Sequence, residues 1–354
     1  MQNAALYSSL WYVQSMEVDW STGLMWVIDV GRLNIFDTAV PVVNGPPKLL
    51  LLDLTTGGAV VHTFIFPDSV ASCTASFLND IVVDHTRGVA YISDAGTGAI
   101  VVYDLAANAA WRLSSTYTQA DPAALITING IPYPMISAAE DGIAYDPLRD
   151  VVYFCPLRGS QLFSIAAPNL RNAALTDADF ASLTSIVGPK PPSDGLAFSS
   201  NGNLYYGDLN TNALYEWTPG LAMTSARIVA QNSTTMQWID TFAFDEAGNL
   251  LFTTNRLQLY FTQTLNLTDV NMRIFSIPIN GKSYLDLEPA ASPAPGCPAG
   301  SSRPYTAGDM AGLAIGCLTA GVLLSTLVAW CYRRQVTGRT AHASNAIPYQ
   351  PFHE

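Results

Sequence analysis

Short runs of alternating apolar and polar residues recur along most of the chain. Five of them share one pattern: a polar residue, an alternating run that ends near an aspartate, a turn, and a second run rich in aromatic residues. Period-two alternation, β-branched and aromatic residues, and Gly or Asn at the turn predict a β-hairpin for each unit. The five units begin at Gln14, Asn79, Asp141, Asp194 and Asp240.

Further apolar runs follow each hairpin, such as PKLLLLDL after the first and AIVVYDL after the second. Four strands in each repeating unit are typical of a β-propeller blade. Because a propeller closes on itself to protect its strand edges, five written units and a remnant before the first predict six blades. We therefore expect an all-β fold, a six-bladed β-propeller with an incomplete N-terminal blade. Five closed blades are the alternative.

The longest insertion between units runs from Thr116 to Ala139. Pro122, Pro132 and Pro134 predict that it forms an irregular loop over one face of the propeller. Loops held at the rim of a rigid scaffold often carry binding functions. A protein partner at the rim loops is therefore one interpretation.

The composition changes after the last predicted strand. Residues 310–332 contain no charged residue and are long enough to cross a hydrocarbon core of about 30 Å as a helix. Three arginines follow directly, and this excess of positive charge predicts a cytosolic C-terminus. The predicted parts are a propeller at 1–288, a Pro/Ala/Gly-rich stalk at 289–309, a transmembrane helix at 310–332 and a short cytosolic tail at 333–354.

This topology predicts a single-pass membrane protein with an extracellular or lumenal propeller, in the plasma membrane or an endolysosomal membrane. Residues 1–20 lack the basic start and apolar run of a secretory signal, so we expect a truncated N-terminus. The alternative is post-translational insertion of the anchor, which would leave the propeller in the cytosol. Asn232 and Asn266 begin N-glycosylation acceptor triplets and favour the exterior. Tyr349 and Phe352 fit a tyrosine-based sorting motif in the tail.

Composition excludes several classes of protein. Only 12% of the residues are charged and 49% are hydrophobic, which excludes a disordered chain. A formal net charge of -12 offers no basic surface for nucleic acid. No nucleophile elbow, phosphate loop or zinc-ligand spacing is present, so acyl and phosphoryl transfer find no support.

The polar residues that begin the five units are the candidate functional residues. Equivalent positions of radially repeated blades converge on the propeller axis, so Gln14, Asn79, Asp141, Asp194 and Asp240 should surround one small ligand. A ring rich in oxygen atoms also suits Ca²⁺. The other interpretation is that each Asp or Asn caps a turn by accepting hydrogen bonds from backbone N–H groups. Turn capping is also the interpretation for a second in-phase set, Asp29, Asp94 and Asp208.

Several strings of the sequence are similar to segments of the major royal jelly protein and yellow family. They include MEVDWSTGLMWVIDVGRLNI, SFLNDIVVD, AYISDAGTGAIVVYDL, DGIAYDPLRDVVYF and DTFAFDEAGNLLFTTNRLQ, and the resemblance runs from Met16 to Ile279. It implies a six-bladed, secreted propeller. Asn255 resembles a residue near the family's pocket mouth, which adds it to the ligand-contact candidates. In a related class of six-bladed lactonases, calcium ligands resemble Asn79 and Asp194, whereas their glutamate corresponds here to Gln14.

The resemblance implies several activities, because the family includes pigmentation proteins, dopachrome-converting enzymes, salivary binders of biogenic amines and nutritive proteins. Our preferred hypothesis is a membrane-anchored propeller that binds a small molecule, such as an aromatic amine, in its channel. The alternative is a dopachrome-type isomerase, for which Asp141, Asp194 or Asp240 would move the proton. A calcium-dependent lactonase and an adhesion scaffold are further alternatives.

Overall fold

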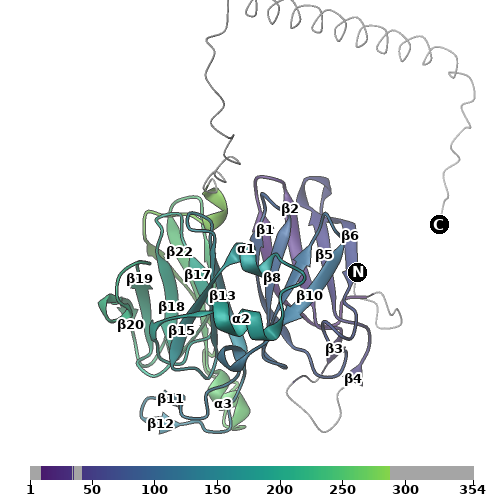
Figure 1. Ribbon diagram of the computed structural model, residues 1–354. Helices are drawn as coiled ribbons and strands as arrows, with labels where there is room; N and C mark the ends of the chain where they lie inside the picture. The colour runs from purple at the N-terminus through teal and green to yellow at the C-terminus, as the bar shows by residue number, and fades with distance from the viewer. Residues whose placement is uncertain (1–8, 34, 36–41, 288–354) are drawn as a thin grey trace, which may run out of the picture. The chain divides into compact units, whose positions relative to one another are not determined.

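The predicted hairpins form, and each becomes the inner half of an antiparallel sheet that runs outward from a common axis (Figure 1). The computed structural model describes residues 9–33, 35 and 42–287. Within them, five sheets form the blades of an all-β propeller. The axis is lined by the first strand of each sheet, because the chain enters every blade at its innermost strand.

The first three blades each contain four strands. Blade 1 consists of β1 (Val13–Asp19), β2 (Leu24–Asp29), β5 (Lys48–Asp53) and β6 (Ala59–Ile65). Blade 2 consists of β7 (Leu78–Asp84), β8 (Val89–Asp94), β9 (Ala99–Asp104) and β10 (Ala109–Leu113). Blade 3 consists of β13 (Glu140–Asp146), β14 (Val151–Pro156), β15 (Gln161–Ala166) and β16 (Ser185–Pro189).

Blade 4 also has four strands, whereas blade 5 has three. Blade 4 consists of β17 (Leu196–Phe198), β18 (Leu204–Asp208), β19 (Ala213–Trp217) and β20 (Arg227–Gln231). Blade 5 consists of β21 (Trp238–Phe244), β22 (Asn249–Asn255) and β23 (Arg273–Pro278).

Short elements connect the blades. Two small hairpins are β3 (Arg32–Leu33) with β4 (Val42–Val43), and β11 (Thr127–Ile128) with β12 (Ile131–Pro132). The helices are α1 (Ala167–Leu170), α2 (Asp177–Leu183) and α3 (Leu257–Phe261). The 3-10 turns are η1 (Leu54–Thr56), η2 (Thr116–Thr118), η3 (Met223–Ser225) and η4 (Tyr284–Asp286).

The prediction of six blades with an incomplete N-terminal blade was wrong for the part of the chain that the structure describes. Blade 1 is complete, and the blade that lacks a strand is blade 5. The residues just before β1 form no strand because their backbone N–H groups are used elsewhere. Those of Trp11 and Tyr12 donate to the carboxylate of Asp29, at 3.1 and 2.7 Å.

Apolar side chains between the sheets join the blades in sequence order. One cluster links blades 1 and 2, a larger one links blades 2, 3 and 4, and a third links blades 4 and 5. The aromatic residues that recur in the second strands are all buried in these interfaces: Trp26, Tyr91, Tyr153, Tyr205 and Phe252. Among the described residues, no such cluster joins blade 5 to blade 1.

The chain returns to the axis after blade 5. Ser283 forms a bridge with Ser199, and the backbone of Lys282 exchanges hydrogen bonds of 2.8 Å with Ser200. This carries Tyr284 in η4 into the core cluster of blades 2, 3 and 4. We call residues 282–287 the C-terminal strap, because they tie the end of the domain to blades that precede it.

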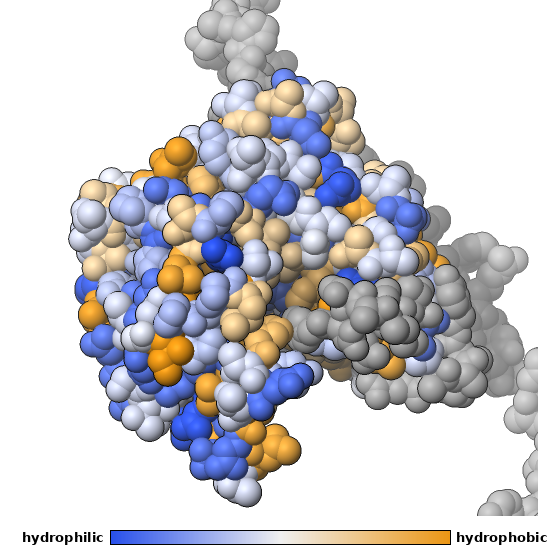
Figure 2. Space-filling model, turned by 90° about the horizontal axis from the view of Figure 1, so that it is seen from below, coloured by the Kyte–Doolittle hydropathy of each residue, from blue (hydrophilic) through white to orange (hydrophobic). Residues whose placement is uncertain are grey.

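The predicted rim loop between Thr116 and Ala139 contains the β11–β12 hairpin. It packs on Trp238 and Leu257 at the end of the propeller that is lowest in Figure 1. Figure 2 shows this lower face, on which exposed apolar residues are scattered among polar ones. We therefore base no interaction proposal on it.

No helix in the described part of the chain is long and apolar enough to cross a membrane. The predicted stalk, transmembrane helix at 310–332 and sorting motif at Tyr349 and Phe352 lie outside the described residues.

Candidate functional site

The innermost strands carry a β-bulge at the same place in four of the five blades. The register shifts between Val13 and Ser15 in β1, between Leu78 and Ile81 in β7, between Glu140 and Gly142 in β13, and between Ile239 and Phe242 in β21. A bulge sets two residues opposite one and redirects side chains, which is why bulges are common next to functional sites. Each bulge here contains one of the predicted channel residues.

These bulges bring the predicted channel residues together on the axis. The amide of Gln14 donates to Asn79 at 2.8 Å, and the amide of Asn79 donates to Asp141 at 2.5 Å. The carboxyl groups of Asp141 and Asp194 are neighbours, and burial together with the charge of Asp194 raises the pKa of Asp141 well above its ordinary value. A chain of polar contacts therefore runs from blade 1 to blade 4.

Asp240, on β21 of blade 5, is the fifth predicted channel residue. Its carboxylate accepts a hydrogen bond of 2.5 Å from Asn255, the residue predicted near the pocket mouth. The indole N–H of Trp238 donates to Asp194, also at 2.5 Å. These contacts are not turn caps, so the turn-capping interpretation does not describe this set.

Turn capping does describe the second in-phase set. Asp94 accepts hydrogen bonds from the backbone of Phe77, Gly96 and Thr97, and Asp208 accepts them from Asn210 and Thr211. Buried carboxylates in these positions hold the loops at the lower end of the blades.

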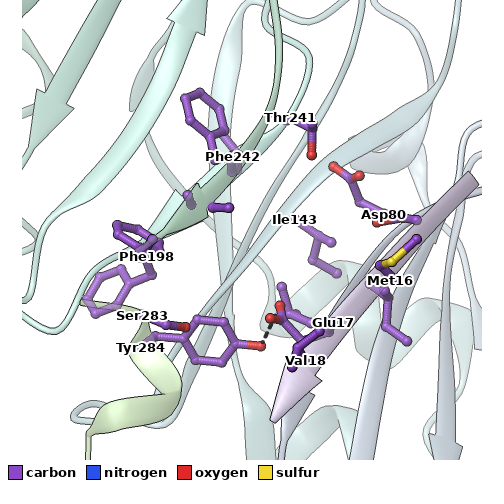
Figure 3. Close-up of a pocket in the computed structure, with 18 of the residues that line it drawn as sticks. Met16, Glu17, Val18, Asp80, Ile143, Phe198, Thr241, Phe242, Ser283 and Tyr284 are labelled. Carbon is purple, nitrogen blue, oxygen red and sulfur yellow. Dashed lines mark hydrogen bonds between the residues drawn. The ribbon is translucent and has the colours of Figure 1, made fainter. Parts of the chain in front are cut away.

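A cavity of about 510 Å³ opens along the axis next to the carboxyl groups. All five innermost strands and the C-terminal strap line it, with β1 and β21 facing each other across it (Figure 3). Apolar side chains lie between the ends, namely Met16, Ile143, Phe198 and Phe242, with Thr241 among them (Figure 3). Pockets of this size with few, convergent polar groups are typical small-molecule sites.

The lower end of this axial cavity is strongly acidic. Burial, together with the charges of Asp194, Asp240 and Glu17, raises the pKa of Asp80 well above its ordinary value. Burial and the charge of Asp194 raise the pKa of Asp240 to about 8. The structural cause is that the blades crowd three carboxyl groups into a space from which most water is excluded.

The opposite end of the cavity, which is uppermost in the orientation of Figure 1 and lies below Asp80 in the view of Figure 3, holds a fourth acid, Glu17, on β1. Its carboxylate accepts a hydrogen bond of 3.1 Å from the hydroxyl of Tyr284 in the C-terminal strap (Figure 3). Burial raises the pKa of Glu17 to about 7, although the Tyr284 hydrogen bond acts in the opposite direction.

None of these acids has a cationic partner among the described residues. The ion pairs that form involve other carboxylates. Lys282 lines the cavity, but its ammonium group pairs with Glu246 at 2.6 Å. Asp80 lines the cavity, whereas the fully buried Glu140, beside Asp141, is not among the lining residues and is attracted to the ammonium group of Lys190. The cavity thus concentrates uncompensated acid.

The calcium site considered from the sequence, with Asn79 and Asp194 as ligands, stays a prediction. In the described part of the chain, no three His, Cys, Asp or Glu side chains are placed to hold a metal ion. The side-chain oxygen of Asn79 accepts the Gln14 amide, and Asp194 accepts the Trp238 indole. Both proposed ligands therefore already use side-chain oxygens in hydrogen bonds.

The model of the major royal jelly protein family matches residues 13–282, which include all five blades and the axial cavity. The chain belongs to the major royal jelly protein family. Major royal jelly protein 1 of Apis mellifera is 26% identical over 285 residues, covering 72% of this chain and 63% of the relative. Protein yellow of Drosophila melanogaster is 22% identical over 271 residues, covering 73% of this chain and 49% of the relative. This family member thus spans about half of the length of protein yellow and somewhat less than two thirds of that of major royal jelly protein 1.

Solved structures similar to this member of the royal jelly family are distant. A nidogen/laminin complex gives a TM-score of 0.44 at 15% identity, covering 68% of this chain and 72% of the other. A virginiamycin B lyase from Staphylococcus aureus gives 0.44 at 10% identity, covering 76% and 70%. Scores this low carry no functional argument.

Sequence reasoning missed four residues of the site in this royal jelly family chain: Glu17, Asp80, Glu140 and Tyr284. Asp80 and Glu140 each stand directly beside a predicted channel residue, Asp80 inside the bulge of β7 and Glu140 at the edge of the bulge of β13. Two adjacent polar residues break the period-two alternation, and this break in the pattern is the signal that could have found them. Tyr284 follows the last strand, where the repeat offers no guide.

Proposed function

We propose that the protein binds a small cationic molecule, such as an aromatic amine, in the axial cavity. The observation that carries this proposal is the group of acids at the cavity wall that lack any cationic partner. A protonated amine would supply the missing charge and hydrogen-bond donors to Asp80, Asp194 and Asp240. Phe242, which is partly exposed, would offer aromatic surface for the rest of the molecule.

Calorimetric titration of the full 354-residue chain tests this proposal with a matched pair of ligands. Phenethylamine carries the ammonium group, and 2-phenylethanol has nearly the same shape without the charge. Binding of the amine but not of the alcohol is expected, because the ring alone leaves the carboxylates uncompensated. Equal binding of both, or of neither, would contradict the proposal.

Asp80→Asn is the variant that reports on the site, because Asp80 lines the cavity. It should weaken amine binding about ten-fold, the value of one charge-assisted hydrogen bond. Asp269→Asn is the control, since Asp269 is 51% exposed and pairs with Arg256 away from the cavity.

A second candidate is proton transfer of the dopachrome-isomerase type, and the paired carboxyl groups of Asp141 and Asp194 favour it. One protonated and one ionised carboxyl group can take a proton from a carbon beside a carbonyl and return it elsewhere. Turnover of dopachrome that is abolished in Asp194→Asn would support this activity. Amine binding without turnover would favour the binding function alone.

We also propose that the span at 310–332 anchors the propeller on the exterior or lumenal side of a membrane. The support is the apolar span, the arginines that follow it, and the exposure of Asn232 and Asn266. Glycosidase treatment of the cellular protein should lower its apparent mass, and Asn232→Gln with Asn266→Gln should abolish that shift. A protein with no shift before or after mutation would contradict the exterior placement.

A further inference from the structure

The acids of the axial cavity are not spread evenly along it. Asp80, Asp194 and Asp240 lie at the lower end, where the bulges of the innermost strands converge. Glu17 lies beyond the bulge of β1 and meets Tyr284 of the C-terminal strap. In Figure 3, the carboxyl groups of Asp80 and Glu17 lie at separate places on the wall, with Ile143 between them.

The wall between the two acidic ends carries several apolar side chains. Met16 and Ile143 occupy it on one side, and Phe198 and Phe242 on the other (Figure 3). A bound hydrocarbon segment would be desolvated there, whereas a charged or hydroxylated segment would lose its hydrogen bonds to water.

We infer that the cavity selects a dication, in which two ammonium groups are separated by a short apolar segment. This rests on the proposed binding function and narrows its ligand class. One ammonium group lies among Asp80, Asp194 and Asp240, the apolar segment crosses the middle, and the second ammonium group meets Glu17. Aliphatic diamines are the simplest molecules of this class.

Two features of the upper end support a second cation there. The hydroxyl of Tyr284 gives its one hydrogen to Glu17 and accepts the backbone N–H of Val83 at 2.8 Å, so it leaves most of the carboxylate's acceptor positions open. Lys282, which also lines the cavity, pairs with Glu246. A monoamine would leave Glu17 without a cation.

Titration calorimetry of the full chain with a graded ligand series tests the inference. The probes are α,ω-diamines from 1,3-diaminopropane to 1,8-diaminooctane, with n-butylamine and phenethylamine as monoamines. One chain length should bind at least about ten-fold more tightly than either monoamine, because the second ammonium group adds a charge-assisted contact. Equal affinity of monoamines and diamines would overturn the inference while leaving the proposed function intact. Failure of every amine to bind would overturn both.

Variants assign the two ends separately. Glu17→Gln keeps the acceptor for Tyr284 and should lower diamine affinity to that of a monoamine, with monoamine affinity unchanged. Asp80→Asn should weaken both ligand types, and the exposed Asp269→Asn should change neither. An equal effect of Glu17→Gln on monoamines and diamines would overturn the assignment of the second ammonium group to Glu17.

Proton release gives a second readout that needs no variant. Burial raises the pKa of Asp80 and of Glu17, and a bound cation favours the ionised forms of both groups. Binding of a diamine should therefore release more protons to the buffer than binding of a monoamine. The measured binding enthalpy of the diamine should consequently change more steeply with the ionisation enthalpy of the buffer. Identical proton release for both would contradict contact of the second ammonium group with an acid.

Discussion

Tyr284 donates its hydroxyl hydrogen bond to Glu17, a residue 267 positions earlier in the chain, across 3.1 Å. The same hydroxyl oxygen accepts the backbone N–H of Val83 at 2.8 Å. One side chain of the C-terminal strap thereby joins the innermost strands of blades 1 and 2. No apolar cluster of the described residues links blades 5 and 1. The hydrogen bonds of Tyr284 therefore help to hold the strap that follows blade 5 against blades 1 and 2.

Tyr284→Phe should destabilise the propeller by about 2 kcal/mol, because it leaves the buried N–H of Val83 without an acceptor and frees Glu17. Chemical unfolding monitored by tryptophan fluorescence measures the change. Tyr215→Phe is the matched control, since Tyr215 stacks on Tyr206 and its hydroxyl makes no hydrogen bond in the described structure. It should cost less than about 0.5 kcal/mol. Equal losses of unfolding free energy in the two variants would show that the hydrogen bonds of the Tyr284 hydroxyl do not stabilise the fold.

Glu17 should make the fold less stable as the pH rises through neutrality. Burial raises its pKa from 4.5 to about 7, so between these values the folded protein holds a proton that the unfolded chain has released. The resulting stabilisation is complete below pH 4.5 and is lost as the pH approaches 7. Glu17→Gln should therefore reduce the fall in unfolding free energy between pH 5 and pH 8 by on the order of 2 kcal/mol. An unchanged pH profile would show that Glu17 ionises normally in the folded state.

Amine affinity should rise with pH across the neutral range. Burial and the charge of Asp194 raise the pKa of Asp240 to about 8, so this group must lose its proton when an ammonium ion binds at neutral pH. When binding releases one proton, the affinity rises about ten-fold for each pH unit of increase, as long as the pH is below the pKa. Titrations at pH 6, 7 and 8 measure this slope, and Asp240→Asn should lower it. A flat profile in the unmodified protein would mean that Asp240 does not face the bound cation.

Gly31 and Gly57 both have φ values in the left-handed region, +76° and +79°, and so form a matched pair. A Cβ at Gly31 would lie 2.5 Å from the carbonyl oxygens of Gly45 and Pro46, whereas a Cβ at Gly57 would meet nothing within 4 Å. Gly57→Ala should therefore cost about 1 kcal/mol for backbone strain alone. Gly31→Ala should cost about 3 kcal/mol or more, because rigid backbone must also move. Thermal unfolding of the two variants distinguishes these contributions. Similar losses of stability would mean that the backbone at 45–46 moves at little cost to accept the new Cβ.

Apolar runs bounded by turn residues predict the hairpins well, because strands whose two faces are both covered by neighbouring blades are buried at nearly every position. The phase of the repeat also places Asn79, Asp141, Asp194 and Asp240 on the axis, since equivalent positions of radial blades must converge. Both predictions succeed for the same reason, which is that each repeated sequence unit forms one blade and the blades are arranged around one axis.

The parts that could not be predicted are those that break the repeat. A bulge turns Asp80 into the cavity beside Asn79, and only the local loss of alternation indicates it. Tyr284 reaches Glu17 through a segment that has no counterpart in the other units. The blade count was wrong for a related reason, because Trp11 and Tyr12 bind Asp29 instead of pairing as a strand.

The order in which the apolar clusters link the blades makes the domain resemble a short linear array of repeats. An interior blade has a neighbour on both sides, whereas blades 1 and 5 each share an apolar interface with one. In such arrays, local opening begins at the end units and the middle units open last. The burial of the innermost strands follows this order, since every residue of β13 in blade 3 is buried, whereas β1 and β21 alternate between covered and exposed positions. Backbone amides should accordingly exchange with solvent most slowly in blade 3.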